Sequence, residues 1–393
     1  MLQKKIVTHQ SNNKLKFLQA LLVALTILGF ETISFIDPLY DLYGESVSIA
    51  YRFIYILIGL AVVFKYSFSR KVIISKPLRV ILFFWFIYFI KALFDTLNNH
   101  ELPYEYILQF WTFSSLLCFL PILFFIPLIN QATLNYARKL TFALAIFVNI
   151  FAFNNNFSSL IQGIITRFNA NTILNSITYG QTGVILIIMS LTYFYSTKKY
   201  RFIYIGLIIL GLSNIGLAAA RGPFLQLFAV VTVYFYFNFK KLRYSGLFAL
   251  ISLLVIISYY FSEYLFIFDS VYSRLTNTNE SPELRNILFS NSWNEFLNNP
   301  LFGGRAITEN AHNIFLGSLE AIGIMGGILM LIIYKNAYRA IKKLVTIQSL
   351  DWIVLILVMQ LFGALTSGSI WDQWILWPML GLVSTLFYNR SLY

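Results

Sequence analysis

Long apolar runs separated by short polar stretches recur along almost the whole chain. A helix needs about 20 predominantly apolar residues to cross a bilayer, and runs of about that length occur twelve times. We therefore predict an all-α, polytopic membrane protein with about twelve transmembrane helices, in which residues 1–393 form a single membrane domain. The predicted spans are 17–36, 47–64, 79–94, 106–128, 140–154, 177–195, 202–219, 223–238, 245–262, 313–334, 350–368 and 373–388.

The composition supports a membrane protein. Of the 393 residues, 58% are hydrophobic and only 11% are charged. A soluble domain of this length has no need of so much apolar surface, whereas helices that satisfy their own backbone inside lipid do. The chain has a single cysteine, Cys118, so an intramolecular disulfide is excluded.

The net charge of +13 comes mainly from lysines and arginines in the loops between the predicted spans. If the N-terminus lies in the cytoplasm, 22 of the 29 lysines and arginines fall on the cytoplasmic side. We therefore predict that both termini are cytoplasmic and that the basic charge reflects topology, with no nucleic-acid partner. No charged residue falls clearly at a bilayer midplane, and the other basic residues gather at the outer face: Arg52, Lys91, Arg167, Arg221, Arg274, Arg285 and Arg305.

A long outer loop, about residues 263–311, separates the ninth and tenth predicted spans. Within it, residues 281–300 predict a short helix that begins at Ser281-Pro282 and ends before Pro300. Its aromatic face suits the membrane interface. Arg285 falls near the first turn, where a guanidinium and unpaired backbone N–H groups favour a phosphate. The alternative is a surface arginine that reaches toward lipid headgroups.

A second arginine, Arg221, begins the eighth predicted span at its outer end. Pro223 suits the first helical position, and Gly222 allows a close backbone approach. The positive end of the helix dipole repels an arginine unless an anion lies between them, which favours anion binding at Arg221.

His312 and Asn313 lie where the long loop enters the tenth span. The chain has three histidines, and the other two, His9 and His100, lie in a basic tail and a short loop. The helix dipole there disfavours imidazolium, so a neutral His312 is a candidate general base. The alternative is an interfacial histidine hydrogen-bonded to its own loop.

The chain contains no phosphate-binding GxxxxGKS loop, no CxxC metal pair and no HExxH motif. We therefore predict neither a metal nor a cofactor.

Three of these segments together resemble the bacterial O-antigen ligase and polymerase superfamily. HNIFLGSLEAIGIMG resembles its His-Asn signature, and AARGPFLQLF resembles its arginine-bearing entry into an earlier span. LRNILFSNSWNEFLNNPLFGG resembles its outer-loop segment of arginine, tryptophan, proline and glycines. The resemblance covers roughly residues 205–335. Gly303-Gly304 departs from it, because family members often have a spacer between these glycines.

The resemblance implies a glycosyltransferase of the bacterial inner membrane with a periplasmic active site. Its donor is a glycan on undecaprenyl pyrophosphate, and the acceptor is a sugar hydroxyl. His312 would take the acceptor proton and Arg221, Arg285 and Arg305 would bind the pyrophosphate. The secondary candidates are Arg274, Lys91, Arg52 and Asn313.

The resemblance leaves the acceptor open. A polymerase joins one lipid-linked repeat to another, with membrane lipids and a chain-length regulator as further partners, whereas a ligase transfers the chain to lipid A core. The long loop has only about 50 residues, and no second polar domain is present to bind a lipopolysaccharide acceptor, which favours a polymerase. A lipid-linked oligosaccharide flippase and a non-catalytic scaffold are the alternatives from other classes. A flippase should place charges inside a central cavity, and a scaffold needs no histidine at a helix mouth.

Overall fold

A computed structural model describes residues 2–36, 46–67, 74–98, 103–125, 129–161, 169, 175–197, 199–218, 220–238, 281–307 and 312–388. Every regular element in these ranges is a helix. In chain order they are α1 (Leu2–Ile36), α3 (Ser46–Ser67), α4 (Lys76–Asn98), α5 (Tyr104–Trp111), the π-helix η1 (Thr112–Phe119), α6 (Leu120–Phe124), α7 (Gln131–Ile161), α8 (Ser176–Ser196), α9 (Arg201–Ala218), α10 (Arg221–Asn238), α13 (Ser281–Asn298), α14 (Ile314–Ile322), α15 (Ile324–Leu344), α16 (Asp351–Thr366), the 3₁₀-helix η2 (Ile370–Asp372) and α17 (Leu376–Tyr388).

Seven stretches of helix in the described part of the chain are long and apolar enough to cross a membrane, which agrees with a polytopic membrane protein. They are Lys14–Phe35, Lys76–Asn98, Tyr104–Phe124, Gln131–Phe157, Ser176–Ser196, Arg201–Ala218 and Ile324–Leu344. Two shorter apolar helices, α16 and α17, follow. The predicted ninth span and residues 263–280 and 308–311 of the long loop lie outside the described residues.

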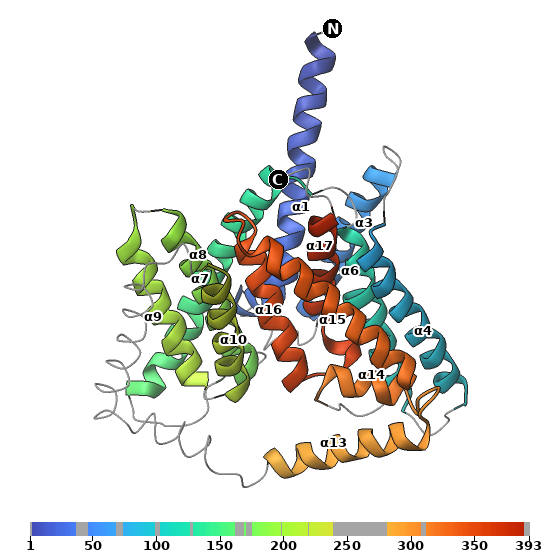
Figure 1. The fold of residues 1–393 in the computed structure, drawn as a ribbon. Helices are drawn as coiled ribbons and strands as arrows, with labels where there is room; N and C mark the ends of the chain where they lie inside the picture. Colours follow the sequence, from blue (N-terminus) through green and yellow to red (C-terminus); the bar gives the residue numbers. More distant parts are fainter. Residues whose placement is uncertain are drawn as a thin grey trace.

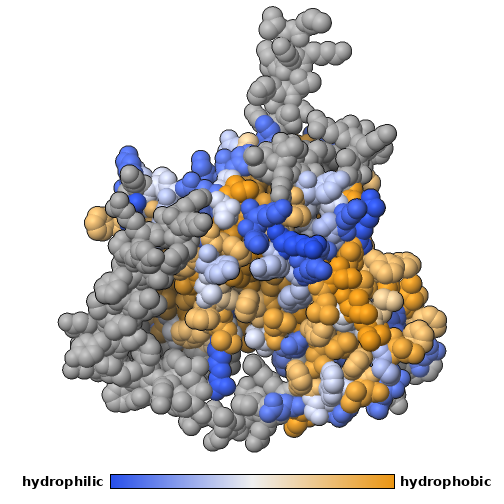
Figure 2. Space-filling view, viewed as in Figure 1, coloured by the Kyte–Doolittle hydropathy of each residue, from blue (hydrophilic) through white to orange (hydrophobic). Residues whose placement is uncertain are grey.

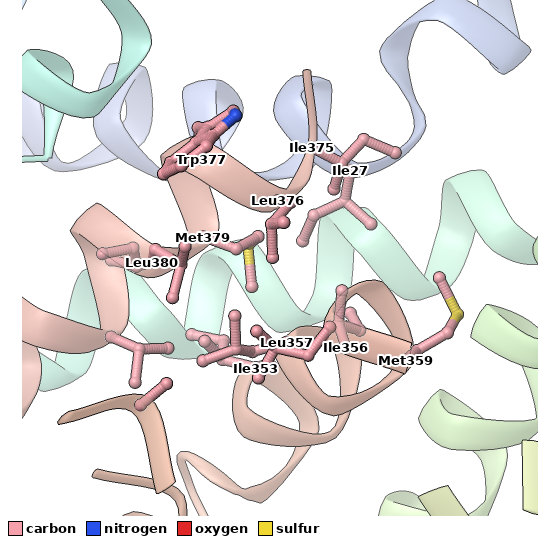
Figure 3. Packing of buried hydrophobic residues seen from close by; sticks show 14 of the residues in the cluster. Ile27, Ile353, Ile356, Leu357, Met359, Ile375, Leu376, Trp377, Met379 and Leu380 are labelled. Carbon is pink, nitrogen blue, oxygen red and sulfur yellow. The ribbon is translucent and has the colours of Figure 1, made fainter. Parts of the chain in front are cut away.

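The helices form one bundle around α16 (Figure 1). The helix packs against α8, α10, α15 and α17, and its residues Asp351 to Leu361 are all buried. A helix that is hydrophobic all round belongs inside a bundle, which explains its central position. Figure 3 shows side chains of α16 and α17 facing one another, with Ile27 of α1 beside Ile375. Figure 2 shows hydrophobic residues across the middle of one face, with hydrophilic residues toward the end where α1 begins.

The helix α13 crosses the opposite end of the bundle from the start of α1 (Figure 1). We call this end the α13 end. The prediction of a helix that begins at Ser281 and stops before Pro300 is confirmed. Along α13 the large side chains Phe289, Trp293 and Leu297 lie at helical spacing and are exposed. The sequence predicted a stripe of Phe289, Ser292 and Phe296 with Trp293 beside it, but Ser292 is buried, so the exposed apolar face is this one instead.

The predicted tenth span, 313–334, is not one helix. Gly323 has φ +70°, which ends α14, and α15 begins at the next residue. The break is filled by the end of the long loop, because Ile324 N donates to Pro300 O at 2.8 Å and Gly304 N donates to Glu320 O at 2.7 Å. The two glycines of this contact, Gly303 and Gly323, both have positive φ and pack against backbone atoms.

We expect Gly303→Ala and Gly323→Ala to destabilise the protein. A left-handed conformation costs a residue with a Cβ about 1–2 kcal/mol. The added Cβ would also lie 2.5 Å from the backbone of Ala321 or 2.6 Å from Pro300 O, so the loop must move. Thermal unfolding in detergent measures the effect.

The matched control is Gly206→Ala in α9, where an added Cβ meets nothing within 4 Å. Melting temperatures equal to that of Gly206→Ala would contradict the described docking of the loop on α14.

Candidate functional site

Two of the candidate segments, the start of α10 and the loop before α14, contact the C-terminal end of α16. The start of α10 packs there, since Gln226 is the nearest neighbour of Gly363. The loop before α14 is bound to the same end, because Asn313 Nδ2 donates to Leu365 O at 3.1 Å. The sequence segments that carry Arg221 and His312 thus both contact the C-terminal end of α16. This is the α13 end of the bundle, since α14 contacts both α13 and η2.

His312 lies one residue before the N-cap of α14, and not in the first helical turn as predicted. Its φ of +52° makes it the one residue other than glycine with positive φ in the described ranges. Such a conformation is strained for a residue with a Cβ, and strain of this kind gathers at functional sites. The side chain is half-buried, and its Nδ1 atom is inaccessible to solvent. The ring is therefore held in a defined position at the helix mouth.

Asn313 explains that position. Its Oδ1 accepts hydrogen bonds from Phe315 N and Leu316 N, both at 3.0 Å, and so caps α14. Its Nδ2 makes the bond to Leu365 described above. Asn313 is thus a positioning residue that joins the mouth of α14 to the end of α16, rather than a second group for the anion.

We expect Asn313→Ser and Asn313→Ala to separate these two contacts. Serine is a good N-cap but cannot reach Leu365, so Asn313→Ser should keep most of the stability and lose transfer rate. Asn313→Ala loses both contacts and about 1 kcal/mol of cap energy. Melting temperature and transfer rate, measured on the same preparations, report the two effects. A wild-type transfer rate in Asn313→Ser would show that the bond to Leu365 does not position His312.

Arg221 is the first residue of α10 and is half-buried. The prediction placed Pro223 at the first helical position, but the helix begins two residues earlier. Pro223 instead packs on α8, where it is the nearest neighbour of Gly180. A Cβ at Gly222 would meet no described atom within 4 Å, so packing among the described residues does not explain this glycine.

The remaining candidate arginines for the pyrophosphate include three in the long loop. Arg285 lies in the second turn of α13, but its side chain lies outside the described part of the structure. Arg274 lies outside the described residues altogether. Arg305 is exposed, close to the point where the loop meets α4.

Lys91 belongs to a structural contact. Its Nζ lies 3.3 Å from Asp95 Oδ1 in the next turn of α4. The other oxygen of Asp95 accepts a hydrogen bond from Ala306 N, and Tyr88 Oη donates to Ala306 O at 3.1 Å. These bonds fix the loop to α4 shortly before His312. Because a carboxylate already pairs with Lys91, its geometry favours this structural role over anion binding.

Arg52 lies beside a polar cavity that the sequence did not predict. Its guanidinium carbon lies 4.7 Å from the ring centre of Phe113 and 5.7 Å from that of Phe30. Phe113 lies in the π-helix η1, an element that is frequent at functional sites, and lines the cavity.

The cavity has a volume of about 300 Å³. It lies between the outer parts of α1, η1, α8 and α16 and the turn that leads into α17, with Glu31, Gln181, Gln360, Ser367 and Asp372 among its lining residues. Burial raises the pKa of Asp372 to about 6, although hydrogen bonds from Ser369 N and Gln373 Nε2 act in the opposite direction.

Two acidic side chains, Glu31 and Asp372, thus line this cavity, and the sequence analysis named neither of them as a candidate. Glu31 is only 3% exposed within the span Lys14–Phe35. The sequence alone could have identified Glu31 as a candidate, because an acidic residue within an apolar span is costly and marks a functional site by default.

In comparisons with known proteins, the chain matches no protein-family model and no curated protein.

Proposed function

We propose that this protein is a membrane glycosyltransferase that transfers a glycan from undecaprenyl pyrophosphate to a sugar hydroxyl at the α13 end of the bundle. The observation that carries the proposal is His312, strained at φ +52° and tied through Asn313 to the same end of α16 as Arg221. The resemblance to the O-antigen ligase and polymerase superfamily supports the substrate class.

The reaction needs three events at one place. The acceptor hydroxyl gives its proton to the imidazole of His312, and its oxygen forms a bond to the anomeric carbon of the donor. The bond from that carbon to the pyrophosphate oxygen breaks, and its electron pair leaves with undecaprenyl pyrophosphate. Attack opposite the leaving group inverts the anomeric centre.

The arginines stabilise the leaving group. A hydrogen bond to a charged group contributes about 1.5–3 kcal/mol, so Arg221 and Arg285 together lower the barrier without needing a metal. The start of α10 adds backbone N–H groups and the positive end of a helix dipole. Gly222, which no described side chain crowds, leaves room for a phosphate to approach that backbone.

We further propose that the acceptor is a second lipid-linked repeat, so that the protein is a polymerase of O-antigen or capsular polysaccharide. The loop between the ninth and tenth predicted spans offers little surface for binding a large lipopolysaccharide acceptor. Its described part is a single helix followed by a turn that docks on α14. A ligase that transfers the chain to lipid A core would use the same histidine and arginines.

A deletion strain separates these two reactions by gel electrophoresis of its lipopolysaccharide. A single repeat on the core, without the long-chain ladder, is expected for a polymerase. Bare core with lipid-linked polymer that accumulates would mean a ligase and would contradict the proposed acceptor.

A flippase is the second class of function. It needs a passage for a glycan that carries pyrophosphate, and the cavity between α1, α8 and α16 has two carboxyl groups among its lining. No lysine or arginine is among its described lining residues, so this cavity suits sugars better than the charged end of a lipid-linked donor.

A further inference from the structure

The cavity contains two deeply buried polar groups that the described residues leave without a hydrogen bond. Glu31 is 3% exposed and Gln360 is 5% exposed, and both line the cavity. The atoms Glu31 Oε2 and Gln360 Nε2 are buried and have no hydrogen-bond partner among the described residues. Buried polar groups are normally paired, so each such group needs an explanation. A bound ligand explains both.

The two groups define the chemistry of that ligand. Glu31 Oε2 accepts a hydrogen bond as a carboxylate and can donate one as a carboxylic acid, and Gln360 Nε2 needs an acceptor. A metal cation can satisfy the first but cannot accept a hydrogen bond from the second. A phosphate can satisfy the second, but the described lining of the cavity contains no lysine or arginine to balance its charge. A sugar hydroxyl both donates and accepts, and therefore satisfies both.

The rest of the lining agrees with a sugar. The amides of Asn175, Gln181 and Gln373 add donors and acceptors, and Phe113 and Trp374 add aromatic surface of the kind that packs against sugar rings. Ile177 and Ile375 add apolar surface to the lining. The volume of about 300 Å³ lies at the lower end of small-ligand pockets, which suits a short piece of glycan.

We propose that this cavity binds a sugar residue of the acceptor glycan, with Glu31 accepting from one hydroxyl and Gln360 donating to another. The assignment to the acceptor rests on the proposed function, because the base must meet the acceptor hydroxyl. Ser367 and Gly368 line the cavity, and Leu365, two residues earlier, receives the hydrogen bond that holds the loop of His312. The donor, with its pyrophosphate, belongs with the arginines outside the carboxyl-lined cavity.

The test uses the purified full chain in lipid nanodiscs. The probe is the oligosaccharide repeat released by mild acid from the lipid-linked glycan of the same cells. Calorimetry measures its binding, and release of undecaprenyl pyrophosphate at increasing repeat concentration measures transfer. The variants Glu31→Leu and Gln360→Leu keep side-chain size and remove the hydrogen bond. The matched control is Gln19→Leu, which removes another buried amide, 2% exposed and on α1, that does not line the cavity.

We expect each cavity variant to weaken binding about tenfold or more and to raise the acceptor KM with little change in kcat. Gln19→Leu should bind as the wild type does, and His312→Ala should bind normally without transfer. If a leucine variant does not fold, Glu31→Gln keeps the size and an oxygen acceptor. It should bind the repeat more tightly than Glu31→Leu does, since it keeps an oxygen that accepts a hydrogen bond.

The possible failures are distinguishable. Transfer that depends on His312, with binding and KM unchanged in all cavity variants, would overturn the sugar site and leave the proposed function intact. Binding that depends on Glu31 and Gln360, without any release of undecaprenyl pyrophosphate, would support the sugar site and contradict the proposed function. Calcium or magnesium binding that depends on Glu31, together with no binding of the repeat, would make the cavity a cation site and overturn the proposal.

Discussion

Glycan transfer by His312→Ala is expected to be about 10²- to 10⁴-fold slower than by the wild type, which is the range that a positioned general base contributes. Membrane insertion and binding of the lipid-linked donor should be largely unchanged, because the ring acts on the acceptor proton. The measurement is the initial rate of undecaprenyl pyrophosphate release by purified protein at saturating substrate.

The backbone at His312 requires a second variant. Alanine at φ +52° is strained, so a loss of rate in His312→Ala could include misplacement of the loop. Asparagine tolerates this conformation better but cannot serve as a base, so His312→Asn should show the same loss with wild-type stability. His100→Ala, in another loop, is expected to keep wild-type activity. A wild-type rate in either His312 variant would remove the histidine from the mechanism.

The variants Arg221→Lys and Arg285→Lys are each expected to lose about 90% of the transfer rate or more. Lysine keeps the charge but not the planar pair of donors that binds phosphate at two points. Loss of one charge-assisted hydrogen bond, about 1.5–3 kcal/mol, corresponds to about a 10- to 150-fold loss of rate. The measurement is kcat/KM for the lipid-linked donor.

The matched control for these substitutions is Arg339→Lys, at an exposed position near the far end of α15. Lys198→Ala, predicted on the cytoplasmic side, is a second control. Equal losses in all four variants would indicate a defect in folding or insertion, and the argument for a pyrophosphate site would fail.

The sequence predicts much of the local structure because helices depend on neighbouring residues. Apolar runs predicted the helical segments, and Ser281 and Pro300 bounded α13 correctly. The break in the tenth span was not predicted, because a helix interior tolerates an isolated glycine. Gly323 becomes a break only where Pro300, 23 positions earlier, supplies the acceptor for Ile324 N.

The candidate site shows the same division between local and distant contacts. The polar character of His312, Asn313 and Arg221 at helix starts is visible in the sequence. The cavity is not, because its lining comes from residues 31, 113, 181 and 360, which periodicity along one helix cannot bring together. The contact of Lys91 with Asp95 was not predicted for a similar reason, since it depends on the distant Ala306, whose N donates to Asp95.

The most direct test of the central claim is the reaction itself. Purified protein in nanodiscs is mixed with the lipid-linked repeat of the same cells, and both undecaprenyl pyrophosphate and glycan length are measured with time. The proposal predicts one undecaprenyl pyrophosphate released for each repeat added, with inversion at the anomeric carbon, and release about 10²- to 10⁴-fold slower by His312→Ala. Lipid-linked repeat that is moved across the bilayer, or bound, while every bond between glycan and pyrophosphate stays intact would contradict it.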